Sequence, residues 1–222
     1  GYDPIEMRSG WRDPWSPETQ MVIDISSVEN THYMHQASLH FRADIPATLD
    51  SLASGTAPAQ VWPDNAPDAA RKALGAAFDR SEPWGPAAII DEACAVLPSD
   101  TLASADSGAH RILLSQMWRV EEPRGRVQSS GLCTMGCALP LAIGMKLASP
   151  DRPVVSFSGD AGFLMVAGEL ASAVELKAPV ICIVFVDASL ALIEKKQRER
   201  QMPNRGVDFA RHDFAAIGQA FG

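Results

Sequence analysis

The stretch that decides the fold is VVSFSGDAGFLMVAGELASAVELKAPVICIVFVDASL, residues Val154–Leu190. Its two ends are apolar, and Pro153–Ser158 and Val180–Val186 have the length and β-branched content of strands. The intervening Phe163–Leu176 has the apolar spacing of a helix. A strand, a helix and a second strand in this order predict two parallel strands joined by a right-handed crossover.

The same alternation extends upstream of Val154. Helices are predicted at Ala87–Val96, Ala109–Met117 and Met135–Ala148, and strands at Thr101–Ala105 and Arg126–Gln128. Alternating β and α units predict an α/β fold with a doubly wound parallel sheet. The almost wholly apolar Val180–Val186 is predicted to be a strand buried on both faces.

The residues before Pro86 follow a different pattern. Met21–Ile25 is predicted as a strand, and Ile45–Leu52 as a short helix with a proline in its first turn. Ala53–Gly85 contains four prolines and predicts a linker with one small helix at Asp68–Phe78. Because a lone strand is not stable and no methionine starts the chain, we expect a piece of a longer protein.

Composition excludes several classes of protein. The chain has 222 residues, with 19 Lys and Arg against 27 Asp and Glu, a net charge of −8, and 46% hydrophobic residues. It has no basic cluster beyond Lys195–Arg200, whereas nucleic-acid binding requires a broad positive surface. Its longest apolar run, Val180–Val186, is far shorter than the roughly 20 residues that span a bilayer. We therefore expect a cytoplasmic protein that binds neither nucleic acid nor a membrane.

The cysteines do not form a recognised metal site. Cys133 and Cys137 have CxxxC spacing, but a zinc site needs a second pair of ligands, and His110 does not complete a known pattern. We expect these two, with Cys94 and Cys182, to be buried free thiols in a reducing compartment.

The turn Gly159–Gly162 joins the first strand of the deciding stretch to its helix. In a parallel sheet such a turn lies at the carboxyl edge, where the free N–H groups of a helix start favour an anion such as phosphate. A carboxylate, that of Asp160, fits beside a phosphate if a divalent cation lies between them.

A second carboxylate is expected at the same edge. Asp187 ends the next strand, 27 residues after Asp160. Two carboxylates about 4 Å apart repel by roughly 4 kcal/mol, and a shared cation removes that repulsion. The pattern alone leaves two alternatives open, namely that Asp160 caps the helix and that Asp187 merely ends a strand.

These segments resemble the thiamine-diphosphate motif of the acetolactate synthase and pyruvate decarboxylase superfamily. The resemblance rests on Gly159-Asp160-Ala161-Gly162, on Pro179-Val180 and on Asp187 at the family's distance. Upstream, Gly108-Ala109-His110 is similar to the family's diphosphate-contacting segment, and Ser130–Gly136 is similar to its GLGTMG segment.

The resemblance implies both a domain organisation and a set of site residues. Residues 1–55 would be the C-terminal part of a central α/β domain, 56–84 a linker, and 85–222 the thiamine-diphosphate-binding domain. The implied diphosphate contacts are Gly108, Ala109, His110, Gly159, Ala161 and Gly162, and the implied Mg²⁺ ligands are Asp160, Asp187 and Ser189. Met135 would lie under the bent cofactor, with Ala191 and Leu192 near its thiazolium. Core packing for Met135 and a satisfied helix-start histidine for His110 are the alternatives.

Three positions depart from the family's pattern. Asp187 replaces the usual Asn, which puts the affinity and the metal preference in doubt, and Cys133 stands where Gly is common. Lys196 falls where biosynthetic acetolactate synthases carry a tryptophan, which disfavours a strict biosynthetic enzyme.

The function implied for the parent protein is that of a thiamine-diphosphate- and Mg²⁺-dependent 2-oxo acid decarboxylase or carboligase, a lyase or transferase. This chain would supply the diphosphate and metal half of the site, and the pyrimidine-binding domain of another subunit the other half, in a homodimer or homotetramer. No segment here resembles that second domain, so the catalytic residues, the 2-oxo acid substrate and a role for FAD are open. The alternative is a non-catalytic cofactor-binding or structural fragment without turnover of its own.

Overall fold

The computed structural model describes residues 15–29, 37–57, 62–78 and 80–222 of the chain. Two compact units are present, Gly1–Pro67 and Asp68–Gly222. Helix α2 (Ala66–Ala76) crosses the division between them and corresponds to the helix predicted within the linker. The domain limits proposed from the sequence, at residues 55 and 84, stay predictions.

The first unit contains a two-stranded parallel sheet and a helix. Strand β1 (Ile23–Ser26) pairs with β2 (Leu39–Arg42), with Ile23 opposite Leu39. Helix α1 (Ile45–Ser54) begins after Asp44, whose carboxylate accepts the N–H of Ala47 at 2.9 Å. The predicted strand and helix are confirmed. The sequence did not predict β2, because its alternation of apolar and polar residues extends over only four residues, all of them exposed.

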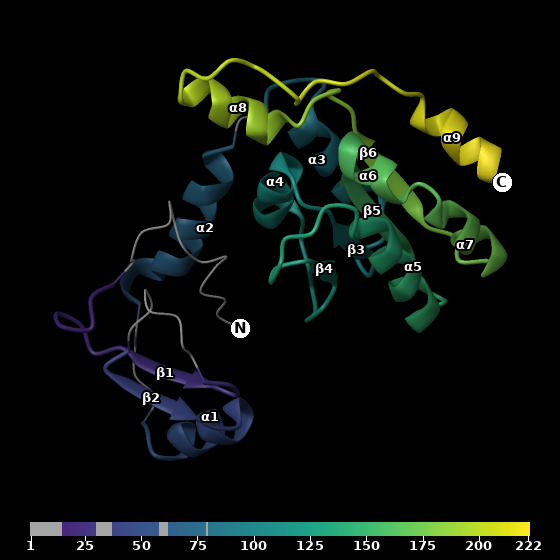
Figure 1. Ribbon diagram of the computed structural model, residues 1–222. Helices are drawn as coiled ribbons and strands as arrows, with labels where there is room; N and C mark the ends of the chain where they lie inside the picture. The colour runs from purple at the N-terminus through teal and green to yellow at the C-terminus, as the bar shows by residue number, and fades with distance from the viewer. Residues whose placement is uncertain (1–14, 30–36, 58–61, 79) are drawn as a thin grey trace. The chain divides into compact units, whose positions relative to one another are not determined.

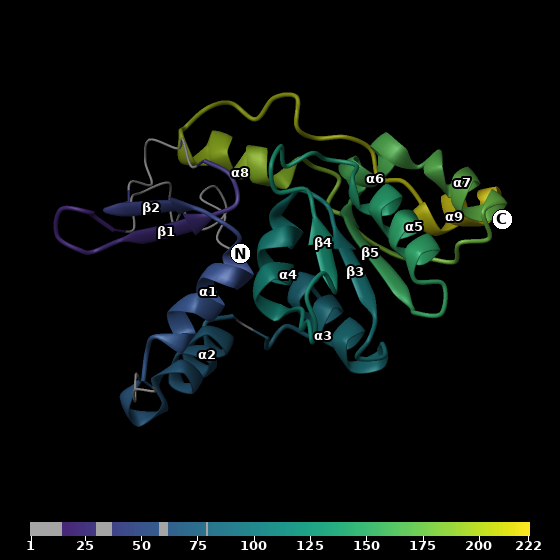
Figure 2. The same cartoon turned by 90° about the horizontal axis from the view of Figure 1, so that it is seen from below.

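A four-stranded parallel sheet forms the centre of the second unit. Its strands β3 (Leu102–Ala105), β4 (Arg126–Gln128), β5 (Val154–Gly159) and β6 (Ile181–Phe185) lie in the order β4-β3-β5-β6 (Figure 1). Helices α3 (Pro86–Val96) and α4 (Ala109–Met117) lie on one side of the sheet and α5 (Ala138–Ala148) on the other (Figure 2). The prediction of a doubly wound parallel α/β sheet is confirmed.

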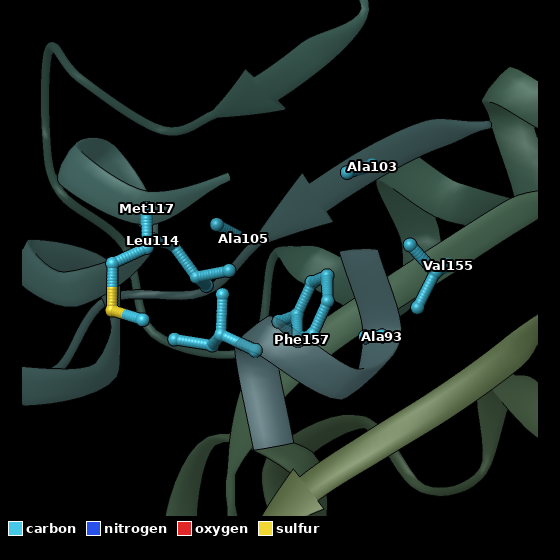
Figure 3. Close-up of a cluster of buried hydrophobic side chains, with 8 residues drawn as sticks. Ala93, Ala103, Ala105, Leu114, Met117, Val155 and Phe157 are labelled. Atoms are coloured by element: carbon cyan, nitrogen blue, oxygen red, sulfur yellow. The ribbon is translucent and has the colours of Figure 1, made fainter. Parts of the chain in front are cut away.

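The hydrophobic core of this unit follows from the two-residue period of its strands. Val155 and Phe157 of β5 point to the same face and pack with residues of α3 and α4, among them Leu114 (Figure 3). Val154 points to the opposite face and packs against Ala142 of α5. The sheet is therefore covered on both faces where it leads to the site.

Two predicted helices differ from the structure at their ends. The helix predicted from Met135 starts at Ala138, because Met135 and Gly136 form a turn in which Gly136 has φ +78°. The helix predicted at Phe163–Leu176 starts earlier and is divided into α6 (Asp160–Val166) and α7 (Glu169–Glu175), so the predicted turn Gly159–Gly162 consists of the last residue of β5 and the first helical turn of α6. The interruption falls at Ala167 and Gly168, where glycine is a poor helix former.

The prediction that Val180–Val186 is buried on both faces is confirmed only in part, because both faces of β6 pack against core clusters but its residues are half-buried or exposed. Among the described residues β6 pairs only with β5, so it lies at the edge of the sheet, and Ile181 is 44% exposed. The apolar run reflects packing on both faces, since Cys182 and Val184 pack against the cluster around Phe163 and Ile183 and Phe185 pack against the cluster around Phe157.

Two further helices complete the described part of the second unit. Helix α8 (Ala191–Glu199) follows β6, and α9 (Phe214–Phe221) begins after Asp213, whose carboxylate accepts the N–H of Ala216 at 2.9 Å. The sequence did not predict either helix, since α8 is strongly charged and α9 is short. Within the described ranges, no helix combines the length and the apolar character that a membrane crossing requires.

Candidate functional site

Three aspartates follow three neighbouring strands of the sheet. Asp106 follows β3, Asp160 comes directly after β5, and Asp187 lies two residues beyond the end of β6. Parallel strands end at a common edge, and the register pairs Ala105 with Phe157 and Gly159 with Phe185. The sheet therefore brings three carboxylates to its carboxyl edge, where ligands usually bind in this class of fold.

A cavity of about 530 Å³ opens at this edge. Every residue that the sequence singled out for cofactor or metal lines it, namely Gly108, Ala109, His110, Met135, Gly159, Asp160, Ala161, Gly162, Asp187, Ser189, Ala191 and Leu192. Segments far apart in the chain thus meet around one space. The expectation that Asp160 and Asp187 share an edge agrees with this placement.

The sequence reasoning missed the apolar part of the wall. Ile112 and Leu113 come from the first two turns of α4, Phe185 from β6 and Ile193 from α8. The helical spacing from Ala109 to Leu113 was a usable signal for the first two. Phe185 and Ile193 reach the cavity only through the packing of β6 and α8.

A larger hollow, about 750 Å³, lies between α7, β6 and α9. Among the described residues, Lys177 is the only charged side chain in its lining, which holds no acidic residue. Because the predicted chemistry-bearing residues line the smaller cavity instead, that cavity is the candidate functional site.

Two helices of nine residues begin in the wall of this cavity. Helix α4 starts after Gly108 and α8 starts after Leu190, and neither start is capped by a hydrogen bond from the side chain of its first flanking residue. The N-terminus of a helix carries partial positive charge and N–H groups without intrahelical partners. The cavity is therefore suited to an anion.

His110 lies in the first turn of α4 and is 7% exposed. Its ring stacks on Phe185 with the ring centroids 5.4 Å apart, and its Nε2 has no hydrogen-bond partner among the described residues. Burial lowers the pKa of His110, although the nearby carboxylate of Asp106 acts in the opposite direction. The alternative of a fully satisfied helix-start histidine is thus not what the structure shows, since a buried ring nitrogen lacks a partner.

Asp160 is 3% exposed, and its carboxylate accepts hydrogen bonds from two separate backbone segments. Its Oδ1 accepts the N–H of Ala161 at 2.8 Å, and its Oδ2 accepts the N–H of Ala188 at 2.7 Å. Ala188 has φ +58°, a strained conformation for a non-glycine residue, and this hydrogen bond helps to hold it. Asp160 therefore does more than cap α6, because it also fixes the turn that carries Asp187.

Asp187 lies on the exposed side of that turn, and its Oδ1 accepts the N–H of Ser189 at 3.1 Å. Partial desolvation raises the pKa of Asp187, and the carboxylate of Asp160 raises it further, against the opposing effect of the Ser189 amide. The carboxylate of Asp160 is thus close enough to disfavour the charge on Asp187. A cation between them would remove this conflict.

Ser189 adds a hydroxyl oxygen to the cavity wall that carries Asp160 and Asp187. Its buried Oγ has no partner among the described residues, and its backbone forms an antiparallel bridge with Asp208. Within the described ranges, no group of three or more His, Cys, Asp or Glu side chains is placed to hold one metal ion. A cation here would therefore use two carboxylates and complete its shell with other oxygens, which is the usual way that proteins hold Mg²⁺ beside phosphates.

The sequence reasoning also missed Asp106, although it follows its strand just as Asp160 does. Asp106 is wholly buried and accepts the N–H groups of Gly136 and Ser107 at 2.9 and 2.8 Å. A Cβ atom on Gly162 would lie 2.2 Å from its Oδ2, so only glycine fits at that position.

Met135 and Cys133 lie in the loop before α5 and both line the cavity. Met135 is half-buried. Cys133 has φ +50°, and its Sγ lies 3.5 Å from a guanidinium nitrogen of Arg111. All four cysteines are free, as predicted, but each is half-buried rather than fully buried. Burial raises the pKa of Cys94, Cys137 and Cys182.

Several known proteins are similar to this chain in sequence. The chain is 30% identical to an acetolactate synthase of Bacillus subtilis and 31% identical to a catabolic acetolactate synthase of Raoultella terrigena, and each match covers the whole chain. It spans about 40% of the length of these two relatives. It is also 34% identical to a probable 2-ketoarginine decarboxylase of Pseudomonas aeruginosa, over 61% of the chain and 24% of that protein.

A family comparison covers the part of the chain that forms the cavity. The family described as "Thiamine pyrophosphate enzyme, C-terminal TPP binding domain" matches residues 106–222, more than half of the chain. The match begins at Asp106 and includes the segments that carry Asp160 and Asp187. This chain therefore belongs to the thiamine pyrophosphate enzymes, and its residues 106–222 are their C-terminal cofactor-binding domain.

Proposed function

We propose that this chain supplies the diphosphate- and metal-binding half of the active site of a thiamine-diphosphate- and Mg²⁺-dependent 2-oxo acid decarboxylase or carboligase. One observation carries the proposal. Two carboxylates, Asp160 and Asp187, lie in the wall of a cavity into which the N-termini of α4 and α8 open. Positive helix ends and acidic side chains in one wall suit a diphosphate bridged to protein by a divalent cation.

Asp160, Asp187 and Ser189 are the proposed Mg²⁺ ligands. Asp160 is fixed by two backbone N–H groups, so its carboxylate is oriented before any ion binds. Ser189 offers a buried oxygen that lacks a partner. A divalent cation would also offset the repulsion that raises the pKa of Asp187, which gives the aspartate at this position a physical purpose.

The proposed diphosphate contacts are the start of α4 and the turn after β5. Gly108, Ala109 and His110 come from the first, and Gly159, Ala161 and Gly162 from the second. At Gly108 a Cβ atom would lie 2.8 Å from Cε1 of His110, so the absence of a side chain lets the chain pass close to the ring. The unpartnered Nε2 of His110 would be satisfied by a diphosphate oxygen.

The rest of the cavity is proposed to hold the remainder of the cofactor. Met135 would support its bent form, and Ala191 and Leu192 would lie near the thiazolium. When bound, the cofactor supplies the electron sink for breaking or forming a carbon–carbon bond next to a carbonyl. The apolar side chains of Ile112, Leu113 and Phe185 would exclude water from that part of the site.

The partners and the setting are also proposals. The substrate would be a 2-oxo acid, and the pyrimidine-binding domain of another subunit would complete the site within a homodimer or homotetramer in the cytoplasm. Whether FAD takes part is open.

A specific observation favours the second candidate, a cofactor-binding module without turnover of its own. The lining of the cavity contains no glutamate among the described residues, although this chemistry needs an acid to protonate the pyrimidine ring.

The proposal is tested by calorimetric titration of the 222-residue chain with thiamine diphosphate, with Mg²⁺ and with excess EDTA. We expect binding that depends on Mg²⁺. Binding of equal strength in EDTA would end the metal assignment, and absence of binding in both would end the cofactor assignment. Release of CO₂ from 2-oxo acids on adding a separate pyrimidine-binding domain would support the enzyme, whereas binding that never leads to turnover would support the module.

A further inference from the structure

We propose that Asp106 is a positioning residue, whose buried carboxylate holds the Met135–Gly136 turn against the Gly159–Gly162 turn and so fixes the spacing between two walls of the cavity. The inference rests on the proposed function, because it concerns a ligand that spans both turns. Asp106 does not line the cavity itself. It would therefore act on the ligand only through the two turns.

The first turn is held by hydrogen bonds. Oδ2 of Asp106 accepts the N–H of Gly136 at 2.9 Å, and Oδ1 accepts the N–H groups of Ser107 at 2.8 Å and Cys137 at 3.3 Å. Asp106 is 0% exposed, and a buried carboxylate is tolerated only when its oxygens are satisfied in this way. Two of the three donors, Gly136 and Cys137, belong to the loop that carries Met135.

The second turn is held by close packing. A Cβ atom on Gly162 would lie 2.2 Å from Oδ2 of Asp106 and 3.5 Å from the backbone nitrogen of Gly136. The same oxygen therefore touches both turns, bonding to one and packing against the other. At Gly136, φ is +78° and a Cβ atom would lie 3.5 Å from the carbonyl oxygen of Gly162. The two turns thus meet backbone to backbone, with Asp106 between them.

This arrangement separates two roles within the cavity wall. The Gly159–Gly162 segment contains Asp160 of the proposed metal site, whereas Met135 lies on the other turn, and residues of both line the cavity. A ligand that touches only the first turn does not depend on the spacing. A longer ligand that touches both does, because any freedom between the turns must be lost when it binds.

The test compares two probes on the 222-residue chain, thiamine diphosphate and inorganic diphosphate, each with Mg²⁺. In Asp106→Asn one carboxylate oxygen becomes an NH₂ group that faces a backbone N–H donor, so at least one of the three backbone hydrogen bonds to this side chain is lost. We expect the Kd of thiamine diphosphate to rise about tenfold, as for loss of a hydrogen bond to a charged group, and that of inorganic diphosphate by less than about twofold. The matched control is Asp151→Asn, the same change at an exposed position.

A second variant covers the case in which Asp106→Asn does not fold, as judged by its thermal melt. Gly136→Ala strains the turn at φ +78° and places a Cβ atom 3.0 Å from Cγ1 of Val166 and 3.5 Å from the carbonyl oxygen of Gly162, so it disturbs the same contact between the two segments and should weaken the same probe selectively. In the double variant the two effects should not add, because both act on one contact. Equal weakening of both probes, or of neither, overturns the positioning role. If the unaltered chain binds neither probe, the proposed function fails first and this inference fails with it.

Discussion

Replacement of Asp160 by alanine tests both the structural role of its carboxylate and its role in the proposed Mg²⁺ site. The change removes the acceptor for two backbone N–H groups, those of Ala161 and Ala188. Hydrogen bonds to a charged group contribute about 1.5–3 kcal/mol each, and two that share one carboxylate are not independent. Relief of the repulsion with Asp187 returns a fraction of the loss. We expect the free energy of unfolding to fall by about 2–4 kcal/mol.

The measurement has two parts. Differential scanning calorimetry of the metal-free chain should show a Tm lower by about 4–16 °C, since each kcal/mol shifts Tm by about 2–4 °C for a chain of this size. Titration with thiamine diphosphate below that Tm should show that Mg²⁺ no longer strengthens binding. The control is Asp151→Ala, which removes an exposed carboxylate outside the cavity and should change neither quantity.

The two readouts separate the two roles of Asp160. If Asp160→Ala lowered Tm but left the Mg²⁺-dependent Kd unchanged, the metal assignment would have to be abandoned and only the bond to Ala188 would stand. If Tm did not change, the hydrogen bonds at 2.7 and 2.8 Å would not carry the stability assigned to them.

Two further predictions follow from the perturbed pKa values at the site. Asp187→Asn should keep Mg²⁺-dependent binding, because an amide oxygen can replace the carboxylate, and should stabilise the metal-free chain at pH 7. The raised pKa of Asp187 means that its ionisation opposes folding as pH rises above the ordinary value of 3.8. The gain in Tm of Asp187→Asn over the unaltered chain should therefore vanish in melts near pH 3.8. A gain that persists there would refute the electrostatic cause. For His110 the folded-state pKa is lowered, so stability is complete above the ordinary value of 6.5 and is lost as pH falls through it. His110→Gln should flatten that part of the Tm profile while His212→Gln, at an exposed site, should not, and identical profiles for the two variants would contradict the assignment.

The local structure of Val154–Leu190 could be predicted from sequence because the patterns that indicate its strands and helices lie within the segment itself. The strand that ends at Gly159, the helical segment beyond it and the strand before Asp187 differ in period and in β-branched content, which needs no knowledge of distant residues. The ends of elements were less predictable. The turn at Met135 and Gly136 looks like the start of a helix in sequence, but the bond from Gly136 to Asp106, 30 residues earlier, holds it outside α5.

The edge position of β6 shows a second limit. An apolar run reports that a strand is packed against something, but not whether neighbours lie on both sides of it in the sheet. That depends on strand order, which involves pairings between distant segments. The sequence pattern therefore overstated the burial of Val180–Val186.

By itself, the sequence determined the alternation of strands and helices, the glycine turn after β5 and the two aspartates that follow neighbouring strands, because each is written in residue types at short range. Only the tertiary structure decided that Asp106 lies between two turns, that Nε2 of His110 is buried without a partner, and that Phe185 and Ile193 complete the cavity wall. These features arise where segments separated by tens of residues touch, and no local pattern specifies such contacts before the sheet brings them together.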